Sequence, residues 1–205
     1  MESMAASRPA RGKVNSPSEA ILLFSDAREW RRWLARNHTA SPGIWVRLSK
    51  KGAETRSVSY AQALEEAICY GWIDAQKRPE SQNFWLQRFT PRGPKSIWSK
   101  RNREKAADLI EAGRMRPAGL AQVERAKQDG RWESAYDSPR TAEVPDDLAA
   151  ALARNAKAGA FFETLDRANR YAVLWRVQTA KKPETRARRI AQFVEMLARH
   201  EKLHP

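Results

Sequence analysis

Residues 59–89 decide the fold of this chain, and they read SYAQALEEAICYGWIDAQKRPESQNFWLQRF. Their first part opens on a capping-box pattern at Ser59, with a glutamine three residues later. Apolar residues then follow at spacings of three and four, which predicts an amphipathic helix. Gly71 is placed to end that helix. Two extended pieces come next, 72–76 and 84–89, and the polar loop between them predicts a β-hairpin.

The residues before this stretch supply the rest of a small sheet. The apolar run 21–24 predicts a short buried strand, and the alternation at 44–48 predicts another. Between them, residues 26–37 have helical spacing behind Ser25, which is the expected N-cap. We therefore expect these two strands and the hairpin to form one sheet that packs with helices, which is the α+β class.

The chain after the hairpin is expected to be helical. Ser99 is placed to cap one helix, and Pro117 suits the first turn of the next. Residues 134–145 are polar and contain proline, which is typical of a linker. The complete prediction is an α+β fold in four parts: a disordered tail at 1–18, an α+β module at 19–133, the linker at 134–145, and an all-helical module at 146–205.

The composition bears on where the protein acts. Its 205 residues include a single cysteine, Cys69, which fits a reducing compartment. No apolar run reaches the roughly 18 residues that cross a bilayer, and the first 18 residues lack the apolar segment of a secretory signal. We therefore expect a cytoplasmic protein without a transmembrane segment.

The formal net charge is +14. One interpretation is a polyanionic partner such as nucleic acid, and the other is a solvated basic surface. The cations concentrate in two clusters: residues 86–105 hold seven Lys and Arg against one acid, and residues 181–189 hold five against one. The second cluster is either a basic helix face or a solvated face with Glu184 and Arg188 paired.

The segment from 70 to 103 is the best candidate for a ligand site, because tryptophans alternate there with cationic and hydroxyl residues. Free N–H groups at a helix start such as Ser99 attract anions. Trp98 either offers a stacking face or anchors its loop in the core. Asp74 either serves a ligand, as a positioning group or as an acid or base, or it is structural, as the partner of a nearby arginine or as a turn cap. The predicted ligand-binding residues are Trp72, Asp74, Arg88, Thr90, Arg92, Lys95, Ser96, Trp98, Ser99 and Asn102.

Two other patterns are expected to be structural. Residues 200–204 read HEKLH and match H-E-x-x-H, in which two histidines one helical turn apart share zinc. Because only Pro205 follows, without a third ligand, we expect a frayed helix end instead. Cys69 lies beside the apolar stripe of its helix, which favours a core role over a nucleophilic one. No motif predicts a catalytic residue, a metal or a cofactor.

Several motifs follow one another along the chain: Ser59-Tyr60 with Glu65-Glu66-Ala67, Tyr70-Gly71-Trp72-Ile73-Asp74, Arg88-Phe89-Thr90-Pro91-Arg92 with Ser96-Ile97-Trp98-Ser99 and Asn102, Gly130-Arg131-Trp132, and Ala180-Lys181-Lys182-Pro183-Glu184-Thr185-Arg186 with Arg188-Arg189. In these motifs the chain resembles the bacterial YdeI/OmpD-associated family of bacteriocin-protection proteins. Ala75 departs from the Gly or Ser that often follows the aspartate. The resemblance runs in order from Phe24 to Leu197. It implies a link with bacteriocin or antimicrobial-peptide tolerance, and it implies no established catalytic mechanism or cofactor.

Three functions follow from these observations. The leading hypothesis is a non-enzymatic protein of envelope stress or bacteriocin tolerance, which binds an anionic small molecule or a protein partner. The second is a nucleic-acid-binding protein that uses the clusters 86–105 and 181–189. The third is an enzyme in which Asp74 is the acid or base.

Overall fold

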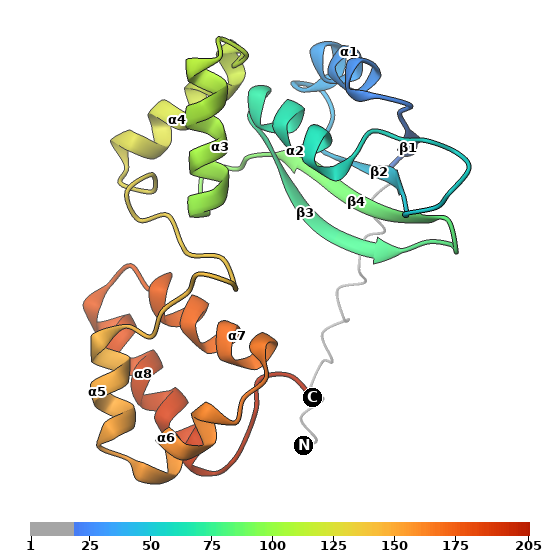
Figure 1. Ribbon diagram of the computed structural model, residues 1–205. Helices are drawn as coiled ribbons and strands as arrows, with labels where there is room; N and C mark the ends of the chain where they lie inside the picture. The colour runs from blue at the N-terminus through green and yellow to red at the C-terminus, as the bar shows by residue number, and fades with distance from the viewer. Residues whose placement is uncertain (1–18) are drawn as a thin grey trace, which may run out of the picture. The chain divides into compact units, whose positions relative to one another are not determined.

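The computed structural model describes residues 19–205, so the predicted tail at 1–18 lies outside the described residues. The described chain divides into two compact units, one of residues 19–67 and 73–91 and the other of residues 68–72 and 92–205. The elements are β1 (Ile21–Leu23), α1 (Ala27–Asn37), β2 (Ile44–Ser49), α2 (Tyr60–Cys69), β3 (Trp72–Pro79), β4 (Phe84–Pro91), α3 (Lys100–Glu111), α4 (Pro117–Gln128), α5 (Asp146–Ala153), α6 (Ala156–Glu163), α7 (Arg167–Gln178) and α8 (Pro183–Ala198) (Figure 1). The predicted α+β class is confirmed.

The first unit is built on a four-stranded sheet in the order β1-β2-β4-β3. β1 runs parallel to β2, and β2 runs antiparallel to β4 with Val46 opposite Gln87. The expected strands at 72–76 and 84–89 are β3 and β4, and they are neighbours in this sheet. β3 is longer than expected and continues to Pro79.

Two local predictions at the start of the sheet are wrong. The strand at 21–24 is not buried: β1 lies at the edge of the sheet, and the side chains of Ile21 and Leu23 are each 41% exposed. The N-cap of α1 is Asp26 and not Ser25. The Asp26 carboxylate accepts hydrogen bonds from backbone N–H groups two and three residues later, at 2.7 and 2.9 Å, and a carboxylate also suits the positive end of the helix dipole.

Trp30 is the centre of the core in the first unit. Its fully buried ring lies 5.0 Å from Phe24 and 5.7 Å from Phe89, measured between centroids. Its indole N–H donates to the carbonyl of Ala63 at 3.0 Å, which ties α1 to α2. The same helices are joined by a bidentate ion pair from Arg31 to Glu66, a carboxylate that is only 3% exposed.

The last two residues of α2, Ile68 and Cys69, belong to the second unit, and α4 packs against them. Gly71 has a φ of +74° and ends α2 as predicted. The N–H of Arg116 donates to the carbonyl of Cys69 at 3.1 Å, and α4 then passes so close that a Cβ on Gly119 would lie 2.8 Å from the carbonyl oxygen of Ile68. Glycine is therefore required where α4 crosses the α2 end.

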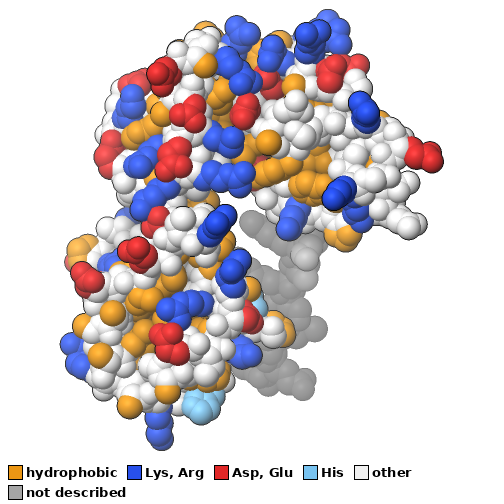
Figure 2. Space-filling model, viewed as in Figure 1, with side chains coloured by type: hydrophobic (Ala, Val, Ile, Leu, Met, Phe, Trp, Pro, Cys, Tyr) orange, Lys and Arg blue, Asp and Glu red, His pale blue; other side chains and the backbone are white. Residues whose placement is uncertain are grey.

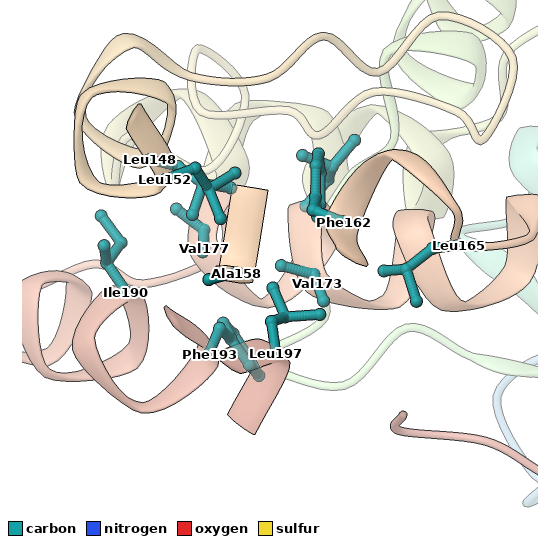
Figure 3. Packing of buried hydrophobic residues seen from close by; sticks show 11 residues of the cluster. Leu148, Leu152, Ala158, Phe162, Leu165, Val173, Val177, Ile190, Phe193 and Leu197 are labelled. Atoms are coloured by element: carbon teal, nitrogen blue, oxygen red, sulfur yellow. The ribbon is translucent and has the colours of Figure 1, made fainter. Parts of the chain in front are cut away.

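The rest of the second unit is helical. Ser99 caps α3 as predicted, since its hydroxyl accepts from the N–H of Asn102 at 3.2 Å. Helices α5 to α8 surround one apolar core, with Phe162, Val173 and Leu197 near its middle (Figure 3). Among residues 19–205, no helix is both long and apolar enough to cross a membrane.

Candidate functional site

Three of the predicted ligand-binding residues lie in the first unit. Arg88 forms a bidentate ion pair with Glu19, whose pKa is lowered chiefly by the hydrogen bond from that guanidinium. Asp74 accepts a hydrogen bond from the hydroxyl of Tyr60 at 2.7 Å, so its partner is a neutral phenol and not the arginine that a structural role was expected to supply. Thr90 is half-buried.

The other seven lie in the second unit, and four of them are buried. Trp72 and Trp98 are each 1% exposed, and Arg92 and Asn102 are also buried. The guanidinium carbon of Arg92 lies 3.5 Å from the centroid of the Trp98 ring, a close cation–π contact. Trp98 also meets Trp132 edge to face, with ring centroids 5.0 Å apart. Trp98 is thus placed as an anchor of its loop.

The remaining three shape the entry to α3. Ser99 is the N-cap described above, and Lys95 is exposed. The hydroxyl of Ser96 accepts from the N–H of Gly93 at 2.9 Å, and its carbonyl accepts from Arg131 at 2.6 Å. Because the ten residues are divided between two units, their common role in one ligand site stays a prediction.

The second unit contains a polar cavity of about 370 Å³, which we call the polar cavity from here on. Its wall consists of Ile97, Asp129, Gly130, Arg131, Ser134, Tyr136, Gln178, Thr179, Ala180 and Lys181. Ile97 comes from the loop before α3, the next five from the segment after α4, and the last four from the end of α7. This volume falls in the range of small-molecule sites.

Arg131 is the buried cation of this wall. Its side chain is 3% exposed, and it donates through Nε to Asp129 at 2.7 Å and through a terminal nitrogen to the carbonyl of Ser96 at 2.6 Å. The hydrogen bond from Arg131 is the main reason that the pKa of Asp129 is lowered, and the charge of Lys181 contributes as well. Two cations therefore face one carboxylate, and the wall keeps a single net positive charge.

Asp137 lies next to the wall residue Tyr136 and bonds to another wall residue, Gln178. Its carboxylate accepts from the amide of Gln178 at 2.7 Å and pairs with the ammonium of Lys100 at 2.7 Å. Its carbonyl accepts from the hydroxyl of Tyr171 at 2.8 Å, and burial raises the pKa of that phenol to about 12, aided by nearby Tyr136 and Asp137. Tyr136 forms a parallel bridge with Ser99. The segment at 134–137 is thereby bonded both to the start of α3 and to α7.

Some cations of the two basic clusters are engaged in ion pairs and hydrogen bonds within the protein. In the first, Arg88 and Lys100 form the ion pairs given above. In the second, Arg186 makes a bidentate pair with Asp147 at 2.6 and 2.8 Å, and Arg189 donates to a backbone carbonyl of α7. Figure 2 shows Lys and Arg side chains interspersed with Asp and Glu on the face in view. Nucleic-acid binding by these clusters stays a prediction. Fewer of their cations are available to contact phosphates than the sequence suggested.

The H-E-x-x-H segment does not form the helical turn that its metal chemistry needs. α8 ends at Ala198, and His200 has a φ of +59° and stacks on Phe161 with ring centroids 4.8 Å apart. The N–H of His204 donates to the side-chain oxygen of Asn169 at 2.9 Å. Within residues 19–205, no group of three or more His, Cys, Asp or Glu is arranged to hold a metal ion. The expected frayed helix end is instead a turn bonded back to α7.

Sequence reasoning did not predict that Arg131 and Lys181 line one cavity. Both residues stand in motifs quoted above, Gly130-Arg131-Trp132 and Ala180-Lys181-Lys182. The signal was that each motif places a cation beside small residues at the end of a predicted helix. The two lie fifty positions apart, so only the folded chain brings them to one wall.

Comparisons with known families divide the chain in two. Residues 22–122 match the model of a domain of unknown function, DUF8412, which contains the blocks at 70–74 and 88–102. Residues 141–200 match the model described as Bacteriocin-protection, YdeI or OmpD-Associated. No curated protein and no solved structure matches the chain. The similarity to the YdeI/OmpD-associated bacteriocin-protection family is therefore shown for residues 141–200.

Proposed function

We propose that the protein binds a small anion in the polar cavity and that this binding contributes to bacteriocin or antimicrobial-peptide tolerance. The observation that supports the proposal most directly is the pair of cations on one wall, Arg131 and Lys181. The family match at 141–200 supports the physiological setting, because Lys181 lies within it. The proposed role is binding, without a chemical step.

The physical argument rests on what each cation is free to do. Arg131 is fixed by Asp129 and by the Ser96 carbonyl, so it shapes the wall without reorganisation, and its pairing with Asp129 leaves Lys181 as the net positive charge. Lys181 is exposed and carries a compact ammonium group with three donors on a flexible stem. An entering carboxylate or phosphate would accept from Lys181 within the field of Arg131.

The test is thermal unfolding of the full chain with inorganic phosphate and with citrate as probes. A ligand present at about ten times its Kd stabilises by roughly 1.4 kcal/mol, which is about 3–6 °C for a protein of this size. We expect this rise in Tm for the wild type and for Lys182→Ala, since Lys182 does not line the cavity. We expect no rise for Lys181→Ala.

The outcome that contradicts the binding site is an equal rise in Lys181→Ala and Lys182→Ala. The tolerance part is tested separately, by survival of bacteria that express the chain during exposure to a bacteriocin. Protection by the wild type and by Lys182→Ala, with loss in Lys181→Ala, is the expected result. Equal protection by all three proteins would show that bacteriocin tolerance does not depend on Lys181 in the polar cavity.

A further inference from the structure

We propose that the tip of the β3–β4 hairpin is a second binding site, for single-stranded nucleic acid. A hollow of about 340 Å³ lies there and is lined by Lys50, Lys77, Arg78, Pro79 and Trp85. Three of these residues are cations, one is aromatic, and none is an acid. The site lies in the first unit and takes a different ligand from the polar cavity, so it does not depend on the function proposed above.

The site is supported by regular structure. Lys50 follows β2 directly and is attached to the hairpin turn twice: its N–H donates to the carbonyl of Asn83 at 2.8 Å, and its ammonium donates to the carbonyl of Ser81 at 2.7 Å. Trp85 stands on β4 opposite Leu48 of β2. Lys77 lies near the end of β3, the strand beside β4. The cations and the indole are therefore carried by one sheet and its turn.

The aromatic ring is positioned to stack. Trp85 is half-buried, and its ring lies 6.0 Å from that of Tyr60 with an angle of 44° between the planes. The ring is held in place by this contact while it forms part of the wall of the hollow. A nucleobase stacked on a fixed indole gains binding energy whatever its sequence, because every base has a π-face.

The charges around the ring match a phosphate backbone. The guanidinium carbon of Arg78 lies 4.3 Å from the centroid of Trp45, which stands on the face of the sheet opposite to Trp85. Lys50 and Lys77 therefore supply the charge beside the ring. The acid next in sequence, Glu80, is engaged in a bidentate pair with Arg47 at 2.6 and 2.8 Å. Glu80 therefore does not neutralise the lining cations, and the hollow presents an aromatic face within a positive field.

Single strands fit this arrangement better than duplexes. In a duplex the bases are stacked on each other and their faces are closed to a protein ring, whereas in a single strand they can stack on Trp85. Lys50 and Lys77 then supply contacts for about two phosphates. A basic groove with an aromatic platform is the usual device for sequence-tolerant binding of single strands.

The experiment measures fluorescence anisotropy of a labelled oligo-dT of about 12 nucleotides with the full chain, at about 50 to 200 mM salt. Two phosphate contacts give a log–log salt slope of roughly −1.4, which is an affinity loss of about 7-fold over this range. Lys77→Ala is expected to reduce the slope to about −0.7. Trp85→Ala is expected to weaken binding about 5- to 150-fold, and Trp85→Phe to restore part of it.

The controls separate this site from general basicity and from the polar cavity. Arg101→Ala removes an exposed cation of the 86–105 cluster. Lys181→Ala removes the lysine that is proposed to bind an anion in the polar cavity. Both variants are expected to bind oligo-dT as the wild type does. If Trp85→Ala does not fold, the oligo-dT affinities of Lys77→Ala and Trp85→Phe still test whether the hollow binds the single strand. Wild-type binding by both of these variants would overturn the proposal, as would equal affinity for a duplex of the same length or binding to phosphatidylglycerol vesicles but not to oligo-dT.

Discussion

Gly119→Ala tests the contact on which the second unit is built. A Cβ at this position would lie 2.8 Å from the carbonyl oxygen of Ile68 and 2.8 Å from the terminal methyl group of Met115, and nearer still to the carbonyl oxygen of Cys69. The methionine can move, but the two carbonyls belong to the end of α2 and cannot. The substitution must therefore push α4 away from α2.

The expected loss of stability is about 3 kcal/mol. Overpacking against backbone falls at the upper end of the usual cost, about 3 kcal/mol. Moving α4 also breaks the hydrogen bond from the Arg116 N–H to the carbonyl of Cys69, which adds about 1 kcal/mol. Alanine has a higher helix propensity than glycine, which offsets about 1 kcal/mol of this loss of stability. For a chain of this length, 3 kcal/mol corresponds to a Tm lower by about 6–12 °C.

The assay is thermal unfolding followed by circular dichroism, with Gly93→Ala as the matched control. A Cβ on Gly93 would meet only the Ser96 hydroxyl oxygen, at an ordinary contact distance of 3.7 Å, so the same substitution is expected to change Tm by less than about 2 °C. A Gly119→Ala protein with the Tm of the wild type would refute the close approach of α4 to the α2 end.

Three other predictions test single contacts. Asp147→Asn removes the negative charge and one of the two oxygens that accept from Arg186. The hydrogen bonds from Arg186 lower the pKa of Asp147 below its ordinary value of 3.8, so the stabilisation is present above about pH 4 and is lost as the pH falls through the lowered pKa. The Tm difference from wild type should therefore shrink in acid. An unchanged difference at low pH would contradict this. Tyr60→Phe removes the donor to Asp74 and should lower the free energy of unfolding in urea by about 1 kcal/mol, and no change would show that the bond contributes nothing. Zinc or a chelator should leave Tm unchanged, because the segment 200–204 is not helical, whereas a zinc-dependent rise would restore the metal hypothesis.

The parts of the fold that follow from local chemistry were predictable. The capping box at Ser59, the cap at Ser99 and the glycine at 71 each act within a few residues, and the structure has all three. The apolar run at 21–24 was misread because a short run looks the same in a central strand and in an edge strand. Its position in the sheet is set by pairing with β2, more than twenty residues away.

The polar cavity was beyond sequence reasoning for a related reason. Arg131 was visible as part of a motif, but its burial depends on the carbonyl of Ser96, 35 residues earlier. The polar segment that begins at 134 looked like a linker because its proline and hydroxyl residues suit a loop. Its bonds to α3 and α7 come through the backbone of Tyr136 and the carboxylate of Asp137, and neither leaves a periodic pattern.

The wall of the polar cavity has a consequence for how its binding could be inherited. Four of the ten wall residues lie in the family segment 141–200, one lies in the domain at 22–122, and five lie in the stretch between the two matches. A gene rearrangement that moved 141–200 into another protein would carry Lys181 and leave Arg131 behind. The short stretch that neither family model covers therefore holds half of the wall residues, Arg131 among them.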